Sequence, residues 1–448
     1  MSQARSSLES ALIFFTLALL VWLPLPIGSN SDWAKALFCV IITLLTGLWA
    51  AMQLNKSTTH NRALKPAIPL FVLLLATQAW VALQWGLGIT TDAGTTLQNL
   101  MLGLGYSFLF ILVVGLFHTR KRLTLLISVL VVSGTLQAFH GTLMTLSGLE
   151  WLLFEPKQHY HGVATGTYVN RNHLAGYLVM TLGLGIGLLM ALRDGAPLRW
   201  RNLLEMLMGP KARLRLALVI MVIALVMTRS RMGNTAFFAS LLVIGGLFVL
   251  LNKEHRVRNS LILASLVLID VLVISQFFGL DRLKDRLINT RVENVVEEGQ
   301  IVAGKNELRL DVFQYAWQQF TDRPITGFGA GSFDASFQSY PGPDIPLYFD
   351  YAHNDYLQFA IEYGVIGWLI LGLFVIGALR QALKALWNRE SWYRSGVGFG
   401  ASMAMLGILI HSATDFNLQI PANAATFVTA AAIAVLAGHH RKARARDS

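Results

Sequence analysis

Four polar side chains that could carry chemistry stand together where an otherwise apolar chain leaves a polar loop. They are His353, Asn354, Asp355 and Glu362, within Y-A-H-N-D-Y-L-Q-F-A-I-E-Y-G-V-I-G at residues 351–367. A histidine, whose ordinary pKa is about 6.5, suits general-base chemistry near neutral pH. Asn354 or Asp355 could instead cap the helix that follows. Glu362 lies two turns into that helix, where a carboxylate is costly unless it is paired.

An arginine in the preceding loop offers complementary chemistry, because a guanidinium fork matches phosphate oxygens. We expect a helix over residues 306–320, and its period predicts one face that contains Arg309, Phe313, Ala316 and Phe320. Three roles fit an arginine on this apolar face. It could extend an aliphatic stem to water, form a structural ion pair, or bind an anion.

Three other polar features give weaker signals. His159 and His161 lack nearby acidic or cysteine partners, so we predict no metal site. The glycines of residues 327–331 could bring backbone amides to a phosphate or form a plain turn, and no strand–turn–helix unit supports a dinucleotide site. Asp270, within an apolar run, is either a proton-relay carboxylate or, as is more usual for a solitary one, a group in an interhelical hydrogen bond.

The composition is that of a polytopic membrane protein. The chain has 448 residues, of which 54% are hydrophobic and 14% are charged, whereas soluble domains are roughly 25% charged. Its mean hydropathy is +0.53. The single cysteine, Cys39, rules out an intrachain disulfide and does not distinguish the cytoplasm from the periplasm.

About twelve apolar runs approach the length of about 20 residues that a membrane-spanning helix needs. The first could be a signal peptide, but the Leu-Pro-Leu-Pro-Ile that follows is not a small-residue cleavage site, so we expect a retained helix. The predicted fold is therefore all-α and polytopic. The runs are Ala11–Ile27, Trp33–Met52, Ala67–Trp85, Leu97–Phe117, Leu123–Leu146, Leu174–Leu192, Leu214–Met227, Thr235–Leu251, Leu261–Leu280, Tyr356–Leu386, Gly396–Ile410 and Ala422–Ala437.

Lysine and arginine cluster in alternate connections, which places these connections and both termini in the cytoplasm. The net charge of +11 is thereby explained by topology, so nucleic-acid binding is not expected, although the basic tail could touch anionic lipid. The large outward loop divides the chain into spans at 1–280, a loop subdomain with short helices at 281–355, and spans with a cytoplasmic tail at 356–448. The basic residues are Lys56, Arg62, Lys65, Arg120, Lys121, Arg122, Arg193, Arg199, Arg201, Lys211, Arg213, Arg215, Lys253, Arg256, Arg258, Lys384, Arg389 and Arg394.

Two arginines break this pattern. Arg229 and Arg231 lie in M-T-R-S-R-M-G-N, a short outward connection between two spans. Cations on the outer side run against the positive-inside tendency, so a partner should hold them. A bound anion or the outer lipid headgroups could be that partner.

Four stretches, taken in order, resemble motifs of the O-antigen ligase superfamily of bacterial envelope glycosyltransferases. Ligases often continue after the last motif with two threonines, whereas this chain has Trp368 and Leu369, a departure that bears on ligase against its relatives. The stretches are G-T-Y-V-N-R-N-H-L-A at 166–175, in which Asn172 matches; T-R-S-R-M-G at 228–233, in which Arg231 matches; R-L-D-V-F from Arg309, followed by P-I-T-G-F-G-A-G to Gly331; and His353-Asn354, nine residues, then Gly364-x-x-Gly367.

The resemblance implies a GT-C-like fold in the bacterial inner membrane and a donor glycan carried on undecaprenyl pyrophosphate at the periplasmic face. Arg231 and Arg309, with Arg229 beside them, would bind the pyrophosphate. His353 would deprotonate or orient an acceptor hydroxyl for inverting attack, without a metal or another cofactor. Asn172 and the polar neighbours of His353, which are Asn354, Asp355 and Glu362, would support the site.

The acceptor divides the possible functions. The preferred interpretation is transfer of O-antigen to lipid A–core. A polymerase that joins carrier-linked repeat units shares the donor chemistry, and a protein O-oligosaccharyltransferase is a third possibility. A transporter of lipid-linked glycans belongs to another class, and paired charges within several spans or repeated halves would indicate it. The sequence shows only Asp270 within a span and no internal repeat.

Overall fold

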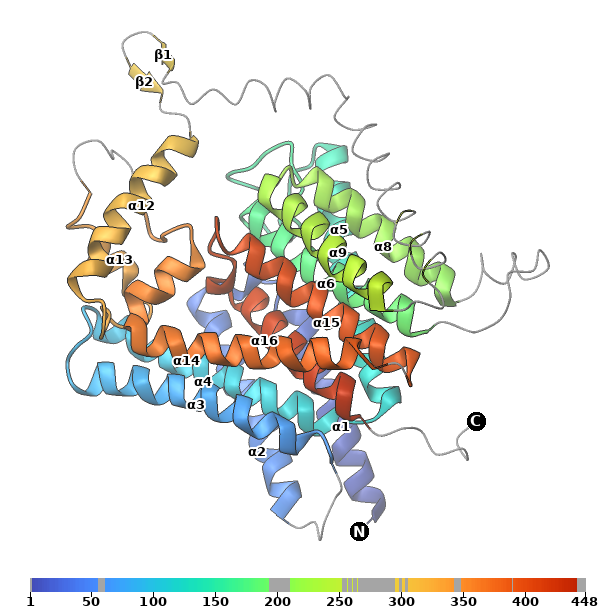
Figure 1. Cartoon of the computed structure of the whole chain (residues 1–448). Coiled ribbons are helices and arrows are strands. Elements are labelled where there is room, and N and C mark those ends of the chain that lie inside the picture. The colour runs from blue at the N-terminus through green and yellow to red at the C-terminus, as the bar shows by residue number, and fades with distance from the viewer. Residues whose placement is uncertain are drawn as a thin grey trace.

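The computed structural model describes residues 2–54, 61–192, 210–251, 295–297, 300–302, 305–341, 348–388 and 390–440, with single residues 256, 260 and 264. Figure 1 shows a bundle of long helices. The elements are α1 (Ser2–Trp22), η1 (Ile27–Ser29), α2 (Asp32–Leu54), α3 (Leu64–Gly86), α4 (Ala93–Leu116), α5 (Arg120–Ser147), α6 (Arg171–Ala191), α8 (Pro210–Met227), α9 (Arg231–Leu251), β1 (Val295–Glu297), β2 (Gln300–Val302), α12 (Lys305–Asp322), α13 (Phe333–Phe337), α14 (Asp355–Leu386), α15 (Trp392–His411), η4 (Asn417–Gln419) and α16 (Pro421–His439).

The predicted all-α polytopic class is confirmed. Within the described ranges, nine helices are long and apolar enough to cross a membrane, and α1 and α8 overlap two further predicted runs. Apart from residue 264, the predicted run 261–280, which contains Asp270, lies outside the described residues. Among the described residues, the β1–β2 hairpin is antiparallel and only three residues long in each strand.

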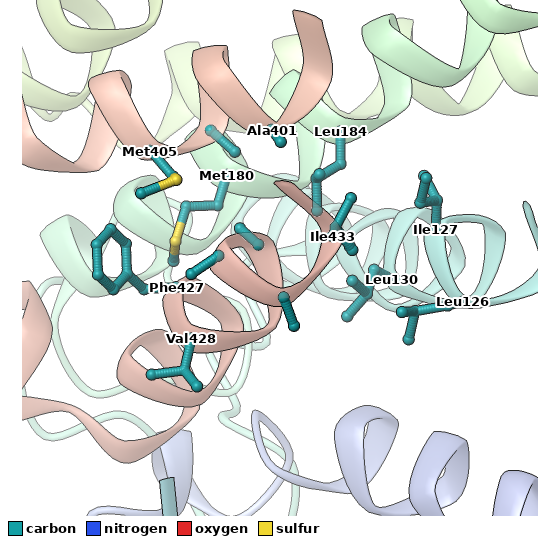
Figure 2. Packing of buried hydrophobic residues seen from close by; sticks show 14 of the residues in the cluster. Leu126, Ile127, Leu130, Met180, Leu184, Ala401, Met405, Phe427, Val428 and Ile433 are labelled. Atoms are coloured by element: carbon teal, nitrogen blue, oxygen red, sulfur yellow. The ribbon is translucent and has the colours of Figure 1, made fainter. Parts of the chain in front are cut away.

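Helices α6, α15 and α16 form the centre of the bundle. In α6 and α16, 94% of the residues in the most apolar stretch are buried, compared with 28% in α2 and α14. Figure 2 shows Met180 and Leu184 of α6 close to Met405 of α15 and to Phe427 and Ile433 of α16. Central helices are therefore apolar all round, whereas outer helices leave one side for lipid.

Glycines let α6 and α15 approach closely. A Cβ atom at Gly187 would lie 2.4 Å from the Gly400 Cα, and one at Gly396 would lie 2.4 Å from the Ala191 amide nitrogen. Both neighbours are backbone atoms, which cannot rotate away. Close backbone packing by small residues is a usual means of membrane-helix association.

The connections that the charge pattern places outward meet at one end of the bundle, which we call the His353 end. The Thr91 amide donates to the Phe328 carbonyl (2.8 Å), and the Ala164 amide donates to the Met227 carbonyl (3.0 Å). The Thr167 hydroxyl donates to the Pro24 carbonyl (2.5 Å). These bonds join residues far apart in sequence, so several connections form one assembled surface.

The basic connections meet at the opposite end. Arg122 Nη1 lies 2.8 Å from Glu9 Oε1, and the Tyr393 hydroxyl donates to the Arg120 carbonyl (3.1 Å). The Asn61 side chain donates to the carbonyl of Val114 (3.2 Å). The predicted grouping of connections into two sets therefore matches two separate ends of the structure.

Helices α12 and α13 pack on the start of α14 through a small second core. The helix predicted over 306–320 is confirmed as α12, but its predicted apolar face is partly wrong: Phe313 is 41% exposed, whereas Val312 and Ala316 are buried. The buried stripe follows Val312 because this is the side that faces the glycine-rich turn and α14. The second core comprises Val312, Ala316, Phe328, Phe333, Phe337, Ala352, Leu357 and Ile361.

For a glycine-to-alanine substitution at the α6–α15 contact, helix propensity predicts a gain in stability and packing predicts a loss. Alanine exceeds glycine in helix propensity by about 1 kcal/mol, yet Gly187→Ala should lower the thermal unfolding midpoint in detergent, because its Cβ meets backbone. Gly246→Ala in α9, whose Cβ would meet nothing within 4 Å, should leave the midpoint unchanged or raise it. Equal midpoints for the two variants would contradict the close packing.

Candidate active site

Two neighbouring polar residues at the start of α14 have different structural roles. Asn354 is the N-cap, with extended backbone, and its Oδ1 accepts from the Leu357 amide (3.1 Å). Asp355 is buried instead, and its Oδ2 accepts from the Ser412 hydroxyl (2.6 Å) and the Leu418 amide (3.0 Å). Of the two alternatives that the sequence left open, the capping role thus belongs to Asn354, while Asp355 fastens α14 to the α15–α16 connection.

His353 has an unusual backbone and an aromatic neighbourhood. Its φ of +51° lies in the left-handed region, which residues other than glycine rarely adopt and which concentrates at functional sites. Its ring forms a T-shaped contact with the Phe416 ring, with centroids 4.9 Å apart. The Phe416 ring also stacks on Tyr351 (4.2 Å) and contacts His173 (4.6 Å). Phe416 therefore packs between the turn at residues 351–353 and the start of α6.

Two buried histidines near His353 were missed by the sequence analysis. His173 Nε2 lies 3.8 Å from Asp415 Oδ1. His411, at the end of α15, is fully buried, and both His411 and His353 lie near His173. The available signal was the position of His173 next to Asn172 in the first motif. The fold was needed to add His411, which follows a long apolar run.

Asn172 and Arg231 lie at the same corner of the His353 end. Asn172 is buried at the start of α6, where its backbone amide donates to Asn170 Oδ1 (2.9 Å). A Cβ at Gly233 would lie 2.6 Å from the Ala175 Cβ, so the start of α9, which begins with Arg231, packs on the start of α6. The structure thus brings three of the predicted site residues, His353, Asn172 and Arg231, to neighbouring helix ends.

The side chains of Arg229 and Arg231 are exposed to solvent. The φ of Arg229 is +52°. Neither forms an ion pair with any side chain that the structure describes. Arg309 lies within α12, but its side chain is outside the described residues. The positions leave Arg229 and Arg231 accessible to an anion from outside the protein.

Glu362 is satisfied by hydrogen bonds from the glycine-rich turn. Its Oε2 accepts from the Gly331 amide (2.9 Å), and its Oε1 accepts from Gln358 Nε2 (3.0 Å). The side chain is 1% exposed. The expected pairing of this carboxylate is therefore provided by amide donors of the protein.

The same turn repairs a break in α14. Gly364 has φ +62° and ψ 179°, which interrupts the helix. The amides of Phe328 and Gly329 donate to the carbonyls of Ile361 (2.9 Å) and Glu362 (3.0 Å), which the break would leave without partners. These amides are consequently committed to α14, which favours the structural interpretation of the glycine run over a phosphate loop.

The two glycines of the last motif serve close packing. A Cβ at Gly364 would lie 2.1 Å from the Ile325 carbonyl oxygen, and one at Gly367 would lie 2.7 Å from Trp80 of α3. The Trp80 indole donates to the Tyr363 carbonyl (2.7 Å). This motif therefore combines the candidate histidine with glycines that fix the helix behind it.

The loop over residues 148–170 has its own internal order. Lys157 is buried, with its Nζ 2.5 Å from Glu150 Oε2, and His161 Nε2 lies 3.0 Å from the Lys157 carbonyl oxygen. His159 is exposed. Among the described side chains, no group of three histidine, cysteine or acidic residues is arranged to hold a metal ion.

A cavity of about 580 Å³ adjoins the His353 turn. Residues Asp350 and Tyr351, which precede His353, form part of its wall, together with the starts of α2 and α4, the glycine-rich turn and α13. Burial raises the pKa of Asp350, whereas hydrogen bonds from Thr95, first from its hydroxyl, lower the pKa of Asp92. Burial raises the pKa of Tyr351 to about 12, so its hydroxyl stays protonated at neutral pH.

Because Asn354 and Asp355 have different structural roles, we expect their substitution to lower the free energy of unfolding by different amounts. Asn354→Ala should lower the free energy of unfolding by about 1 kcal/mol, and Asn354→Ser should keep the cap. Asp355→Ala should cost more, because a buried and a partly buried donor lose their acceptor, and an unsatisfied buried donor costs about 1–3 kcal/mol. Thermal unfolding in detergent measures both effects. If Asn354→Ser were as unstable as Asn354→Ala, capping would not be the main structural role of Asn354.

Comparison with known proteins agrees with the motifs. Residues 216–372 match a family model described as O-Antigen ligase. This range runs from α8 to the middle of α14 and contains Arg231, Arg309, His353 and Glu362. No curated protein matches the chain. Over residues 216–372, this match therefore confirms the resemblance to the O-antigen ligase superfamily.

Proposed function

We propose that the protein transfers an O-antigen glycan from undecaprenyl pyrophosphate to lipid A–core at the periplasmic face of the bacterial inner membrane. The observation that carries the proposal is the O-antigen ligase match at 216–372 together with the convergence of the motif residues at one end of the bundle. The donor and acceptor are both lipid-anchored, which suits a multi-pass membrane protein whose polar residues gather where the helices end.

His353 takes the proton of the acceptor hydroxyl in this proposal. The hydroxyl oxygen attacks the anomeric carbon, the bond from that carbon to the pyrophosphate oxygen breaks, and the pyrophosphate leaves with the electron pair. Attack from the side opposite the leaving group inverts the anomeric configuration. A positioned base within hydrogen-bond reach typically contributes about 10²–10⁴-fold to the rate. The left-handed backbone at His353 supports this role.

Arg231 and Arg309 stabilise the charge that develops on the leaving pyrophosphate. Preorganised donors aimed at developing charge are often the largest single contribution to catalysis. The exposure of Arg231 and Arg229 at the His353 end supports their role as anion ligands. Asn172 supports the same corner from the start of α6, and Asp355 and Glu362 hold the α14 segment that carries His353.

The membrane orientation follows the charge pattern. The proposal places the His353 end in the periplasm and the Arg122 end, with both termini, in the cytoplasm. Residues 281–355 then form a periplasmic subdomain over the active site, between spans at 1–280 and 356–448. The packing of α12 and α13 on the start of α14 supports this arrangement.

A polymerase that joins carrier-linked repeat units is the second candidate. Trp368 and Leu369 favour it, because ligases often have two threonines at these positions. Purified protein in lipid vesicles, supplied with a polyprenyl-pyrophosphate glycan and lipid A–core, distinguishes the two functions by the product. Glycosylated lipid A–core supports the ligase. A lengthened carrier-linked glycan supports the polymerase, and movement of the donor across the bilayer without any product would contradict both.

Removal of the imidazole should separate chemistry from donor binding. We expect His353→Ala to reduce transfer by about 10²-fold or more, the range of a lost general base, while donor binding stays within twofold of the unaltered protein. Single-turnover transfer and direct donor binding measure the two quantities. Transfer at the original rate would contradict the proposed base.

Substitution of Arg231 should affect donor binding rather than only the chemical step. Arg231→Ala should weaken binding of the pyrophosphate donor, and Arg231→Lys should restore only part of it, because an ammonium cannot form the bidentate contact. Arg62→Ala provides the matched control, because Arg62 is also exposed but lies at the other end of the bundle. Equal donor affinity for the Arg231 and Arg62 variants would remove Arg231 from the site.

A further inference from the structure

We infer that the cavity beside the His353 turn is a saccharide-binding site that takes a neutral or amino sugar and rejects a phosphorylated one. That this sugar belongs to the acceptor rests on the proposed function. The volume of about 580 Å³ lies within the roughly 300–1,000 Å³ of small-molecule sites. The inference is carried by the chemistry of the wall, which differs from that of the arginine corner.

The wall has a polar part and an apolar part. Asp92, Asp334 and Asp350 lie with the helix starts and the loop at the His353 end, whereas Val40 and Met101 lie within α2 and α4. Val40 and Met101 are both more than half exposed. The cavity therefore joins a polar mouth to exposed apolar side chains of α2 and α4, which suits a sugar attached to a lipid.

The polar part offers both hydrogen-bond donors and acceptors. Carboxylates accept, and the carboxamides of Gln98 and Asn99 both donate and accept. A sugar ring presents hydroxyls that also do both, together with apolar C–H faces. The rings of Phe333 and Tyr351 in the wall supply apolar surface for those faces. This combination matches a polyol better than an apolar ligand.

The charges in the wall select against phosphate. Five carboxyl groups face the cavity, and Lys35 is the one basic side chain among its described lining residues. Opposite charges attract and like charges repel most strongly where water is scarce, so an amino sugar is favoured and a sugar phosphate is disfavoured. The carboxyl groups belong to Asp32, Asp92, Asp334, Asp350 and Glu362.

The cavity and His353 are connected through aromatic contacts. Tyr351 lines the cavity and stacks on Phe416 with ring planes 5° apart, and Phe416 meets the His353 ring. Gln358, also in the wall, accepts from the Ala352 amide (3.1 Å). A saccharide held in the cavity therefore contacts Tyr351 and Gln358, which pack and bond against the segment that precedes His353.

The test measures binding of free sugars to the full chain in lipid nanodiscs by saturation-transfer NMR, so it needs neither donor nor transfer. The probes are glucosamine, glucose and glucose 6-phosphate. Glucosamine should bind more tightly than glucose, and glucose 6-phosphate should bind at least tenfold more weakly than glucose. The inference would be overturned if glucose 6-phosphate bound as tightly as glucose or more tightly. It would also be overturned if none of the three sugars bound.

Variants locate the binding. Ala335 lines the cavity and is exposed, so Ala335→Trp should fold and should abolish the sugar signal by filling the space. Asp334→Asn should lower the preference for glucosamine over glucose. Glu155→Gln, an exposed carboxyl in the 148–170 loop, is the control and should change neither. Sugar binding that survives Ala335→Trp would place the sugar elsewhere and overturn the inference.

The Ala335→Trp variant distinguishes a failure of the cavity proposal from a failure of the proposed function. Sugar binding that Ala335→Trp removes, in a protein that forms no product from any polyprenyl-linked donor, would support the cavity and contradict the glycosyltransferase mechanism. Transfer that continues at its original rate and acceptor dependence in the Ala335→Trp variant would contradict the cavity as an acceptor site and leave the mechanism intact.

Discussion

The interruption of α14 at Gly364 is the constraint on which the candidate site depends. A spanning helix must satisfy its backbone groups internally or against other protein, and the break frees the carbonyls of Ile361 and Glu362. Amides of the glycine-rich turn, which lies some thirty residues earlier, satisfy both, and Gln84 of α3 donates a further bond to Glu362 (2.9 Å). The outward loop is thereby fixed onto the membrane bundle, and the first turns of α14 are held rigid.

This rigid segment explains why a strained residue can stand just before it. Asn354 caps α14, Asp355 fastens it to the α15–α16 connection, and the glycine-rich turn holds Glu362. A left-handed histidine persists only where its surroundings over-determine the backbone. The arginine corner is built by the starts of α6 and α9, whereas the acidic cavity is lined by the starts of α2 and α4. Such a separation would keep an anionic carrier group and a sugar acceptor apart until they meet at the proposed base.

The sequence predicted the parts that depend on local pattern. Apolar length identified the spans, and alternating charge assigned the connections to two ends, because both are properties of contiguous residues. Periodicity found α12 but misassigned Phe313, because the buried face is set by what packs against it. His411, Asp415 and Phe416 around His353, and the cavity with Asp92 and Asp334, required the fold, because their members come from helices far apart in the chain.

The pH dependence of single-turnover transfer, at saturating donor, tests the central claim most directly. A base must be deprotonated to act, so the rate should rise with pH and level off in the unaltered protein. In His353→Gln, which keeps the size and polarity of the side chain without an ionisable group, the residual rate should lose this rise. An unchanged rate with the same rising limb in His353→Gln would contradict the account.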